Sequence, residues 1–255
     1  GGAGGSIGSA TVARAAPDGY TLLINSNAHS VNPSFYAKLP YDTSRDFIDI
    51  GMLAIQPNVL MVNNNSSIKS TLDLIKQAKA KPNAINIAHA GIGSGTHLNS
   101  VKFKLVAGVE FTDVAYKGSG EVIIDVMGGR VDGYFSPISA GMSFIQSGKV
   151  RAVAVSTTKR SSQLPNVPTI AESGLPGFDY YLWFGLWAPA GTPPGIVSKI
   201  TQDFTRALQD TATRDKLATL GNEINIMTPA AFRKLVQSEI LEYAKIVRAA
   251  GITPQ

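Results

Sequence analysis

The stretch "AINIAHAGIGSGTHLNSVKFKLVAG" (84–108) joins an apolar segment, a loop rich in glycine and hydroxyl residues, and an amphipathic segment. Its first seven residues predict a β-strand, because apolar residues dominate a short run that ends at a glycine. Leu98, Val101 and Leu105 recur at helical spacing and predict one buried helix face, with Gly108 placed to end the helix. The stretch therefore predicts a strand, a loop and a helix in succession.

Two later segments repeat this order. A strand at 111–116 precedes a loop at 117–120 and a helical pattern at 121–129, and a strand at 129–135 precedes a loop at 136–139 and a second helical pattern. A fourth strand, 150–156, closes the series. Strands that alternate with helices pair in parallel through right-handed crossovers. The three loops are therefore expected to meet at one edge of the sheet, where open α/β sheets bind ligands.

The segments outside this block predict a second lobe. Residues 18–36 predict a strand that ends in an Asn-rich loop, and residues 48–63 predict two short strands, because Pro57 cannot donate in a central ladder. An aromatic strand begins at Trp183. We expect an inserted α/β lobe at 64–182, within a terminal lobe made of 1–63 and 183–255. Crossing segments near 59–63 and 184–188 would join the lobes around a cleft that closes on a ligand.

Two helices are predicted near the C-terminus. The first follows Thr192, a candidate N-cap, and begins with two prolines. The second has Thr228 as its N-cap, proline at its first position and Gly251 as its stop. Its predicted buried stripe consists of Phe232, Val236, Ile240, Tyr243 and Val247.

Composition excludes several classes of protein. The 255 residues include no cysteine, which excludes disulfides, a thiol nucleophile and Cys-ligated metals. The three histidines lack the short spacings of a zinc site, so a metal is not expected. The net charge is +5, but the basic residues are scattered, so nucleic-acid binding is not expected. No apolar run approaches the length of a membrane span. Residues 1–20 show no charged-then-apolar export segment, so for an exported protein we expect the signal to have been removed before residue 1.

The loop at 89–97 fits no sharp enzymatic motif. It lacks the Gly-Lys of a phosphate-binding loop and the third glycine of a dinucleotide fingerprint. No G-x-S-x-G elbow surrounds Ser94 or Ser119. A serine hydrolase remains an alternative, with Ser94 or Ser119 as the nucleophile and His29 or His97 as the base. Asp113 or Asp132 would then orient the histidine.

The composition of the same loop favours anion binding, which requires no special sequence motif. Glycines allow backbone N–H groups to turn inward, and the N-terminus of the following helix adds a positive dipole. Ser94 and Thr96 supply hydroxyl donors, Lys117 opens the second loop, and Ser136 and Ser139 lie in the third. A carboxylate is the expected guest, because no arginine-rich clamp for a multiply charged phosphate is present.

Several stretches together resemble one family. They include "GAGGSIGSATVARAAPDGYTLL", "VNPSFYAKLPYDTSRDF", "AGIGSGTHL", "VAYKGSGEVIIDVMGGRVDGYF" and "WFGLWAPAGTP". The chain resembles the Bug-type extracytoplasmic solute receptors of tripartite tricarboxylate transporters. The resemblance implies a two-lobed α/β periplasmic binding protein, type II-like, of the Venus flytrap kind. It also implies a receptor that captures a small carboxylate in the periplasm and delivers it to membrane subunits, with no catalysis and no cofactor.

The resemblance also implies site residues. In that family, backbone amides and hydroxyls of loops from both lobes hold the carboxylate. The matching positions of the inserted lobe are Gly93, Ser94, Gly95, Thr96 and His97, with Lys117, Ser119 and Ser136 as neighbours. The terminal lobe offers Asn27 and His29, while Trp183 and Phe184 either line the pocket wall or pack in the core.

Family members begin earlier, with a strand, a loop, a helix and a second strand before the "GAGG" stretch. We therefore expect this chain to lack that first unit and one wall of the cleft. An interaction module with an incomplete pocket is thus a further alternative. The sequence does not choose among di-, tri- and aromatic carboxylates.

Overall fold

The chain forms two compact units in the computed structural model, which describes residues 5–249, 251, 253 and 254. The terminal unit comprises Gly1–Ile55 and Trp183–Gln255, and the central unit comprises Gln56–Leu182. The remaining residues of the predicted terminal lobe (1–4, 250, 252 and 255) lie outside the described residues. The central unit begins at Gln56, where we expected 64, because residues 58–62 pair with strands of that unit.

The chain passes between the units inside two strands, β2 (Phe47–Val62) and β7 (Tyr181–Pro189). The prediction of two short strands around Pro57 was wrong, because β2 is one strand of 16 residues. Pro57 is tolerated because it lies between two paired stretches. Residues 54 and 55 pair with β8 (Glu223–Ile224), and pairing with the central unit starts at Asn58. The missing N–H of Pro57 thus interrupts neither ladder.

The central unit contains the predicted parallel strands. β3 (Asn86–His89) pairs in parallel with β4 (Thr112–Ala115) and with β5 (Gly133–Pro137), which confirms the expectation for these three. β6 (Arg151–Val155) does not join them directly, so the prediction of an uninterrupted series was wrong. β5 and β6 are each antiparallel to β2, which lies between them. β6 therefore has the expected direction but a different neighbour.

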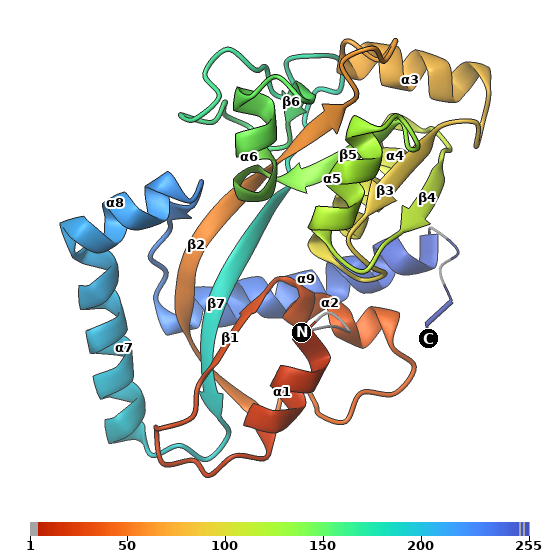
Figure 1. Cartoon of the computed structure of the whole chain (residues 1–255). Coiled ribbons are helices and arrows are strands. Elements are labelled where there is room, and N and C mark those ends of the chain that lie inside the picture. The colour runs from red at the N-terminus through yellow and green to blue at the C-terminus, as the bar shows by residue number, and fades with distance from the viewer. Residues whose placement is uncertain (1–4, 250, 252, 255) are drawn as a thin grey trace. The chain divides into compact units, whose positions relative to one another are not determined.

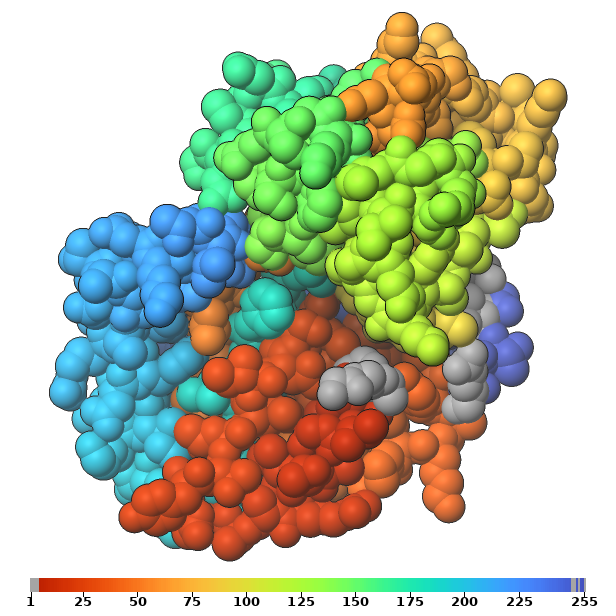
Figure 2. Space-filling view, viewed as in Figure 1, coloured from red at the N-terminus to blue at the C-terminus, as the bar shows by residue number. Residues whose placement is uncertain are grey.

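Four helices accompany this sheet: α3 (Thr71–Ala80), α4 (Gly95–Ala107), α5 (Ser119–Met127) and α6 (Ile138–Gln146). α5 and α6 pack on one face of the sheet through Val122, Ile123 and Ile138, which share a core cluster with Val59 of β2. Figure 1 shows α5 and α6 beside the strands of this sheet, and Figure 2 shows the surface of the same region in the same view. The opposite face receives α4, whose Phe103 ring lies 5.4 Å from that of Phe135 in β5.

The predicted limits of α4 are largely correct. Gly108 ends the helix in the left-handed conformation, at a φ of 60°. Leu98 and Val101 are buried as predicted, but Leu105 is 41% exposed, so the predicted face is wrong at that position. Phe103 takes the buried position in its place.

The terminal unit contains α1 (Ser6–Ala13), β1 (Leu23–Ser26) and α2 (Ala28–Phe35), followed by the larger part of β7. β1 pairs antiparallel with β7. The prediction of a loop after β1 was wrong, because residues 28–35 are helical despite Pro33. Tertiary contacts support this polar helix: the Ser30 hydroxyl lies 2.6 Å from the carboxylate of Glu239 on α9 (Pro229–Ala249).

Two further helices, α7 (Pro194–Gln209) and α8 (Thr211–Thr219), precede β8. Thr192 does not cap α7 as predicted, because Pro193 holds the N-cap position and the Thr192 hydroxyl donates to the carbonyl of Pro189. Thr228 does cap α9, with the Ala231 N–H donating to its hydroxyl over 3.2 Å. The predicted stripe of α9 is buried except for Ile240, which is half-buried. Over the described residues, no helix combines the length and apolar character of a membrane span.

Candidate functional site

The three predicted loops of the central unit meet at the phenol of Tyr134, the second residue of β5. The hydroxyl of Ser119, from the second loop, lies 2.7 Å from the phenol oxygen. Burial raises the pKa of Tyr134 to about 12, while hydrogen bonds with the hydroxyls of Ser119, Thr96 and Ser136 oppose that rise. The phenol is therefore neutral at physiological pH. These contacts confirm that the loops after β3, β4 and β5 converge.

The hydroxyls of the first loop hold its shape. Ser94 is the N-cap of α4, and its hydroxyl accepts the N–H of His97 over 3.3 Å. The same hydroxyl lies 3.0 Å from that of Thr96, which in turn accepts the N–H of Ala90. Ser94 remains half-buried and Thr96 is 3% exposed. The loop is thus fixed from both of its ends.

Two histidine rings brace the glycines of this loop. The rings of His89 and His97 stack with centroids 4.2 Å apart. The Nδ1 atom of His89 accepts the N–H of Gly91, and that of His97 accepts the N–H of Gly93. Burial lowers the pKa of both histidines, that of His97 to about 4, where the neighbouring His89 adds to the effect. Both rings are neutral at pH 7, as an accepting Nδ1 requires, and the Gly93 amide is engaged inside the loop.

The next two amides have no acceptor among the described residues. The N–H groups of Gly95 and Thr96 lie in the first turn of α4, where a helix offers them no acceptor, and no other described residue accepts them. α5 and α6 start at the same edge of the sheet, after Gly118 and Pro137. These two N-cap residues supply no side-chain acceptor to the first turn of either helix. Three helix N-termini therefore direct positive dipole ends toward this edge.

The two remaining predicted residues of the central unit differ in exposure. Lys117 is exposed, and its backbone N–H points to the carboxylate of Glu121 over 3.4 Å. Ser136 is fully buried, and its hydroxyl lies 3.0 Å from the carbonyl of Pro137. Lys117 thus offers a solvated charge beside the site, whereas Ser136 belongs to the hydroxyl cluster around Tyr134.

The predicted residues of the terminal unit are buried within that unit. The N–H of Asn27 donates to the carbonyl of Trp183, and the Trp183 indole donates to Glu239 over 2.8 Å. His29 is fully buried, with Ser9 3.4 Å from its Nδ1, and burial lowers its pKa to about 3. Trp183 is fully buried, as in the packing alternative, and Phe184 is half-buried.

The side chains of the hydrolase alternative have other partners. Ser119 pairs with Tyr134, and Asp132 accepts the backbone N–H of Asn86 over 2.7 Å. Asp113 accepts hydrogen bonds from Ser100 and Lys104. The candidate nucleophile Ser119 and the candidate orienting carboxylates are thus engaged in contacts that position strands and helices.

Sequence reasoning missed two residues of this edge. Tyr134 was overlooked because an aromatic residue inside a strand ordinarily indicates core packing. Tyr180, whose phenol donates to the Gly95 carbonyl over 2.7 Å, lies far along the chain from the loop it contacts. The only available signal for Tyr134 was its place in a strand of the parallel series, two residues before the third loop.

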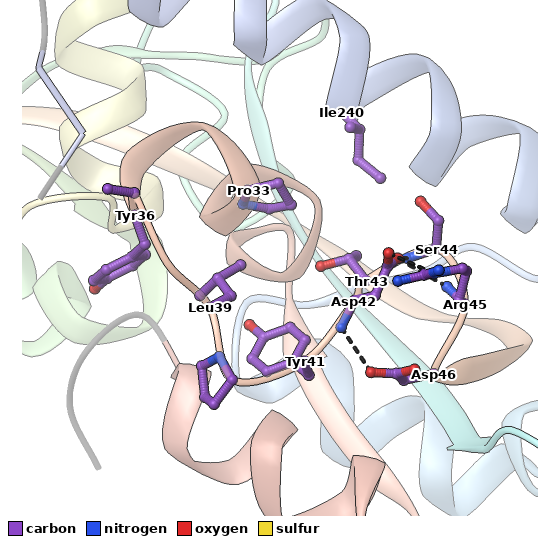
Figure 3. A pocket seen from close by; sticks show the side chains of 12 residues that line it. Pro33, Tyr36, Leu39, Tyr41, Asp42, Thr43, Ser44, Arg45, Asp46 and Ile240 are labelled. Atoms are coloured by element: carbon purple, nitrogen blue, oxygen red, sulfur yellow. Dashed lines mark hydrogen bonds and ion pairs between the residues drawn. The ribbon is translucent and has the colours of Figure 1, made fainter.

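The terminal unit has a separate hollow of about 540 Å³, beside α2 and α9. Figure 3 shows Pro33 and Ile240 above it and Tyr41 below, with Asp42 and Arg45 at one side. The Asp42 carboxylate accepts the N–H of Ser44 and the guanidinium N–H of Arg45. Arg45 pairs with Asp42, while the second lining carboxylate, Asp46, accepts the N–H of Asp42. No predicted site residue lines this hollow.

The chain matches the Tripartite tricarboxylate transporter family receptor over residues 1–252. Rpa4515 of R. palustris, solved with adipate, is 33% identical, with a TM-score of 0.89 over 98% of this chain and 84% of that protein. The periplasmic binding protein BugD is 33% identical, with a TM-score of 0.87 over 100% and 86% of the two chains. MatC of Rhodopseudomonas palustris, solved with malate, is 32% identical, with a TM-score of 0.85 over 96% and 85%.

These neighbours confirm the predicted fold class, an α/β periplasmic binding protein, and the family is one of solute receptors. The chain therefore belongs to the receptors of the tripartite tricarboxylate transporter family.

Proposed function

We propose that this receptor binds a small carboxylate at the edge of the central unit where α4, α5 and α6 begin. The observation that carries the proposal is the pair of free first-turn amides, Gly95 and Thr96, beside the hydroxyl cluster around Tyr134. We further propose that the protein acts in the periplasm and delivers its solute to the membrane subunits of a tripartite transporter. The adipate and malate bound by two solved relatives support this class of ligand.

The chemistry of the edge suits one carboxylate group. A carboxylate accepts hydrogen bonds on both oxygens, and two adjacent helix amides supply matching donors. The helix dipoles favour negative charge, and the rings of His89 and His97 are neutral and add no charge of their own. Lys117 is the exposed cation of the second loop and would draw anions toward the site.

The predicted residues of the terminal unit remain part of the proposal. Asn27 opens α2 and His29 lies in its first turn, so both share the structural setting of Gly95 and Thr96, a strand followed directly by a helix. Trp183 supports this start of α2, because its carbonyl accepts the Asn27 N–H. We propose that Asn27 and His29 belong to a carboxylate-binding element within the terminal unit, and that Trp183 positions α2 there.

Calorimetric titration with malate, adipate, a tricarboxylate and an aromatic carboxylate tests the proposal. We expect the intact protein to bind at least one of them, and we expect Thr96→Val to weaken that binding at least tenfold. Thr201→Val is the matched control, because it removes a hydroxyl that bonds only within α7 of the terminal unit. The proposal fails if none of these solutes binds, or if both variants bind as the parent does.

An esterase assay separates the receptor from the hydrolase alternative. A receptor shows no turnover of ester substrates, so Ser94→Ala or Ser119→Ala weakens binding and has no turnover to remove. Turnover that disappears in either variant would support the hydrolase and contradict this proposal.

A further inference from the structure

Two enclosed asparagine amides lie on the face of the central sheet that packs against α4. Asn58 of β2 and Asn99 of α4 are both fully buried. Within the described part of the chain, the side-chain oxygen and nitrogen of each lack a hydrogen-bond partner. Buried amides are almost always paired, because leaving one unpaired carries the full cost of its desolvation. Four polar atoms therefore require a partner that is not one of these protein groups.

An aromatic contact fixes where the two amides lie. The ring of Phe103 in α4 packs on Phe135 of β5, and Phe135 pairs with Leu60 of β2. Asn99 precedes Phe103 by one helical turn on the same helix face, about 6 Å along the axis. Asn58 precedes Leu60 by two residues on the same strand face, about 7 Å along the strand.

Both displacements point toward the carboxyl end of β5. α4 begins at that edge, and Asn58 pairs with Pro137, the last residue of β5. The same starting contact and nearly equal displacements place the two amides at the same level along β5, one on β2 and the other on α4.

Tyr180 covers this position from a third side. The ring of Phe178 lies 5.9 Å from that of Phe103, and Tyr180 follows two residues later. The phenol of Tyr180 donates to the carbonyl of Gly95, the residue one turn before Asn99. Tyr180 is itself 3% exposed, so the space beside it is closed to bulk solvent.

Ser156 ties Tyr180 to the other asparagine. Its hydroxyl donates to the Tyr180 carbonyl over 2.6 Å and accepts the N–H of Asn58 over 2.9 Å. Its own N–H donates to the Asn58 carbonyl over 2.8 Å. The main chain of Asn58 is thus fixed on both sides, while its side-chain amide is left without a partner.

We propose that Asn58 and Asn99 enclose an ordered water that bridges their side-chain amides and fixes the first turn of α4. Two neutral amides offer donors and acceptors together, which suits water and does not suit an ion. Asn58 and Asn99 are then positioning residues, because they act on a ligand through the Gly95 and Thr96 amides. This role rests on the proposed carboxylate site, whereas the water itself does not.

A crystal structure of the ligand-free protein, at a resolution that shows ordered water, tests the bridge directly. The proposal predicts one water within hydrogen-bond distance of both side chains. A direct hydrogen bond between Asn58 and Asn99, or a space without water, would overturn it.

Leucine variants test the shared water, because leucine keeps the branched shape of asparagine without its polar atoms. Asn58→Leu and Asn99→Leu each leave the opposite amide unpaired, so each should lower the melting temperature by several degrees. The double variant removes both amides and should melt no lower than the worse single variant. Additive losses in the double variant would contradict a shared water.

Carboxylate affinity separates positioning from stability. We expect Asn99→Leu to raise the Kd about tenfold, whereas Val101→Ala should leave it within twofold at a similar loss of stability. Val101 is buried on the same helix but has no polar group, which makes it the matched control. An unchanged Kd in Asn99→Leu would overturn the positioning role. If the parent protein binds no carboxylate, the proposed function fails, and the crystallographic test of the water still decides the bridge.

Discussion

The phenol oxygen of Tyr134 lies 2.7 Å from the hydroxyl oxygen of Ser119, and this contact joins β5 to the first residue of α5. The hydroxyls of Thr96 and Ser136 lie close enough to this phenol to oppose the rise in its pKa. One buried group thus links all three loops of the proposed site. The position of each loop depends on the other two through Tyr134.

Tyr134→Phe removes a single oxygen atom, but it should weaken carboxylate binding clearly, because the position of each loop depends on that hydroxyl. The variant removes the hydrogen-bond partner of the half-buried Ser119 hydroxyl, so we expect a loss of about 1 kcal/mol in the free energy of unfolding. Carboxylate affinity should fall about tenfold, as measured by calorimetry. Tyr116→Phe is the control, because it removes a phenol that bonds to Asp125 of α5 outside the cluster. Equal affinities for the two variants would contradict the linking role of Tyr134.

Ser94→Ala should lower both stability and affinity. Its hydroxyl caps α4, and removal of such a cap costs about 1 kcal/mol. Ser70→Ala removes the equivalent cap of α3, where the Ser70 hydroxyl accepts the Asp73 N–H. We expect urea unfolding to show similar losses for both variants, while only Ser94→Ala weakens carboxylate binding. Weakened binding in both would mean that affinity simply follows the stability of the unit.

Acidification should destabilise the protein between pH 7.5 and pH 5. Burial lowers the pKa of His29 to about 3 and that of His97 to about 4, and it also lowers the pKa of His89. In the unfolded chain these histidines titrate near 6.5, so the unfolded state binds more protons in this range. Stability is then constant above about pH 7.5 and falls on acidification, by at most about 1.4 kcal/mol per pH unit for each histidine.

Urea unfolding at several pH values measures this slope. His97→Gln keeps an acceptor for the Gly93 N–H but does not titrate. It should therefore reduce the slope of stability against pH by the contribution of one histidine. A stability that stays constant or rises on acidification across this range would contradict the burial of neutral histidines.

Lys117→Gln should change the rate of association more than the strength of the bound contacts. Lys117 is exposed, so its charge acts through solvent and is screened by salt. Stopped-flow measurements should show a lower association rate constant at low ionic strength and little difference at high ionic strength. A large change in the dissociation rate constant would instead place the ammonium group in direct contact with the ligand.

Local sequence signals predicted the part of the fold that carries the site. Loops rich in glycine or serine mark where β3, β4 and β5 end, and parallel pairing then requires these loops to meet. The insertion of β2 between β5 and β6 could not be predicted in this way, because it depends on pairing between residues far apart in the chain. The roles of Asn58 and Tyr180 depend on that pairing and were missed with it.

The helix α2 shows a second limit of local signals. Asparagine, serine and proline between 27 and 33 favour turns, because their side chains compete for backbone hydrogen bonds or remove a donor. The helix forms because Ser30 bonds to Glu239 and the apolar residues Val31 and Phe35 are buried. These stabilising contacts are tertiary, so the segment alone indicates a loop.

The most direct test of the central claim is calorimetric titration of the intact receptor with the panel of mono-, di- and tricarboxylates, followed by thermal unfolding with saturating ligand. The account predicts binding of at least one carboxylate, with about 2.7 kcal/mol of added stability at a ligand concentration of 100 times Kd. It also predicts that Thr96→Val weakens this binding while Thr201→Val does not. No heat and no stabilisation with any carboxylate would contradict the account.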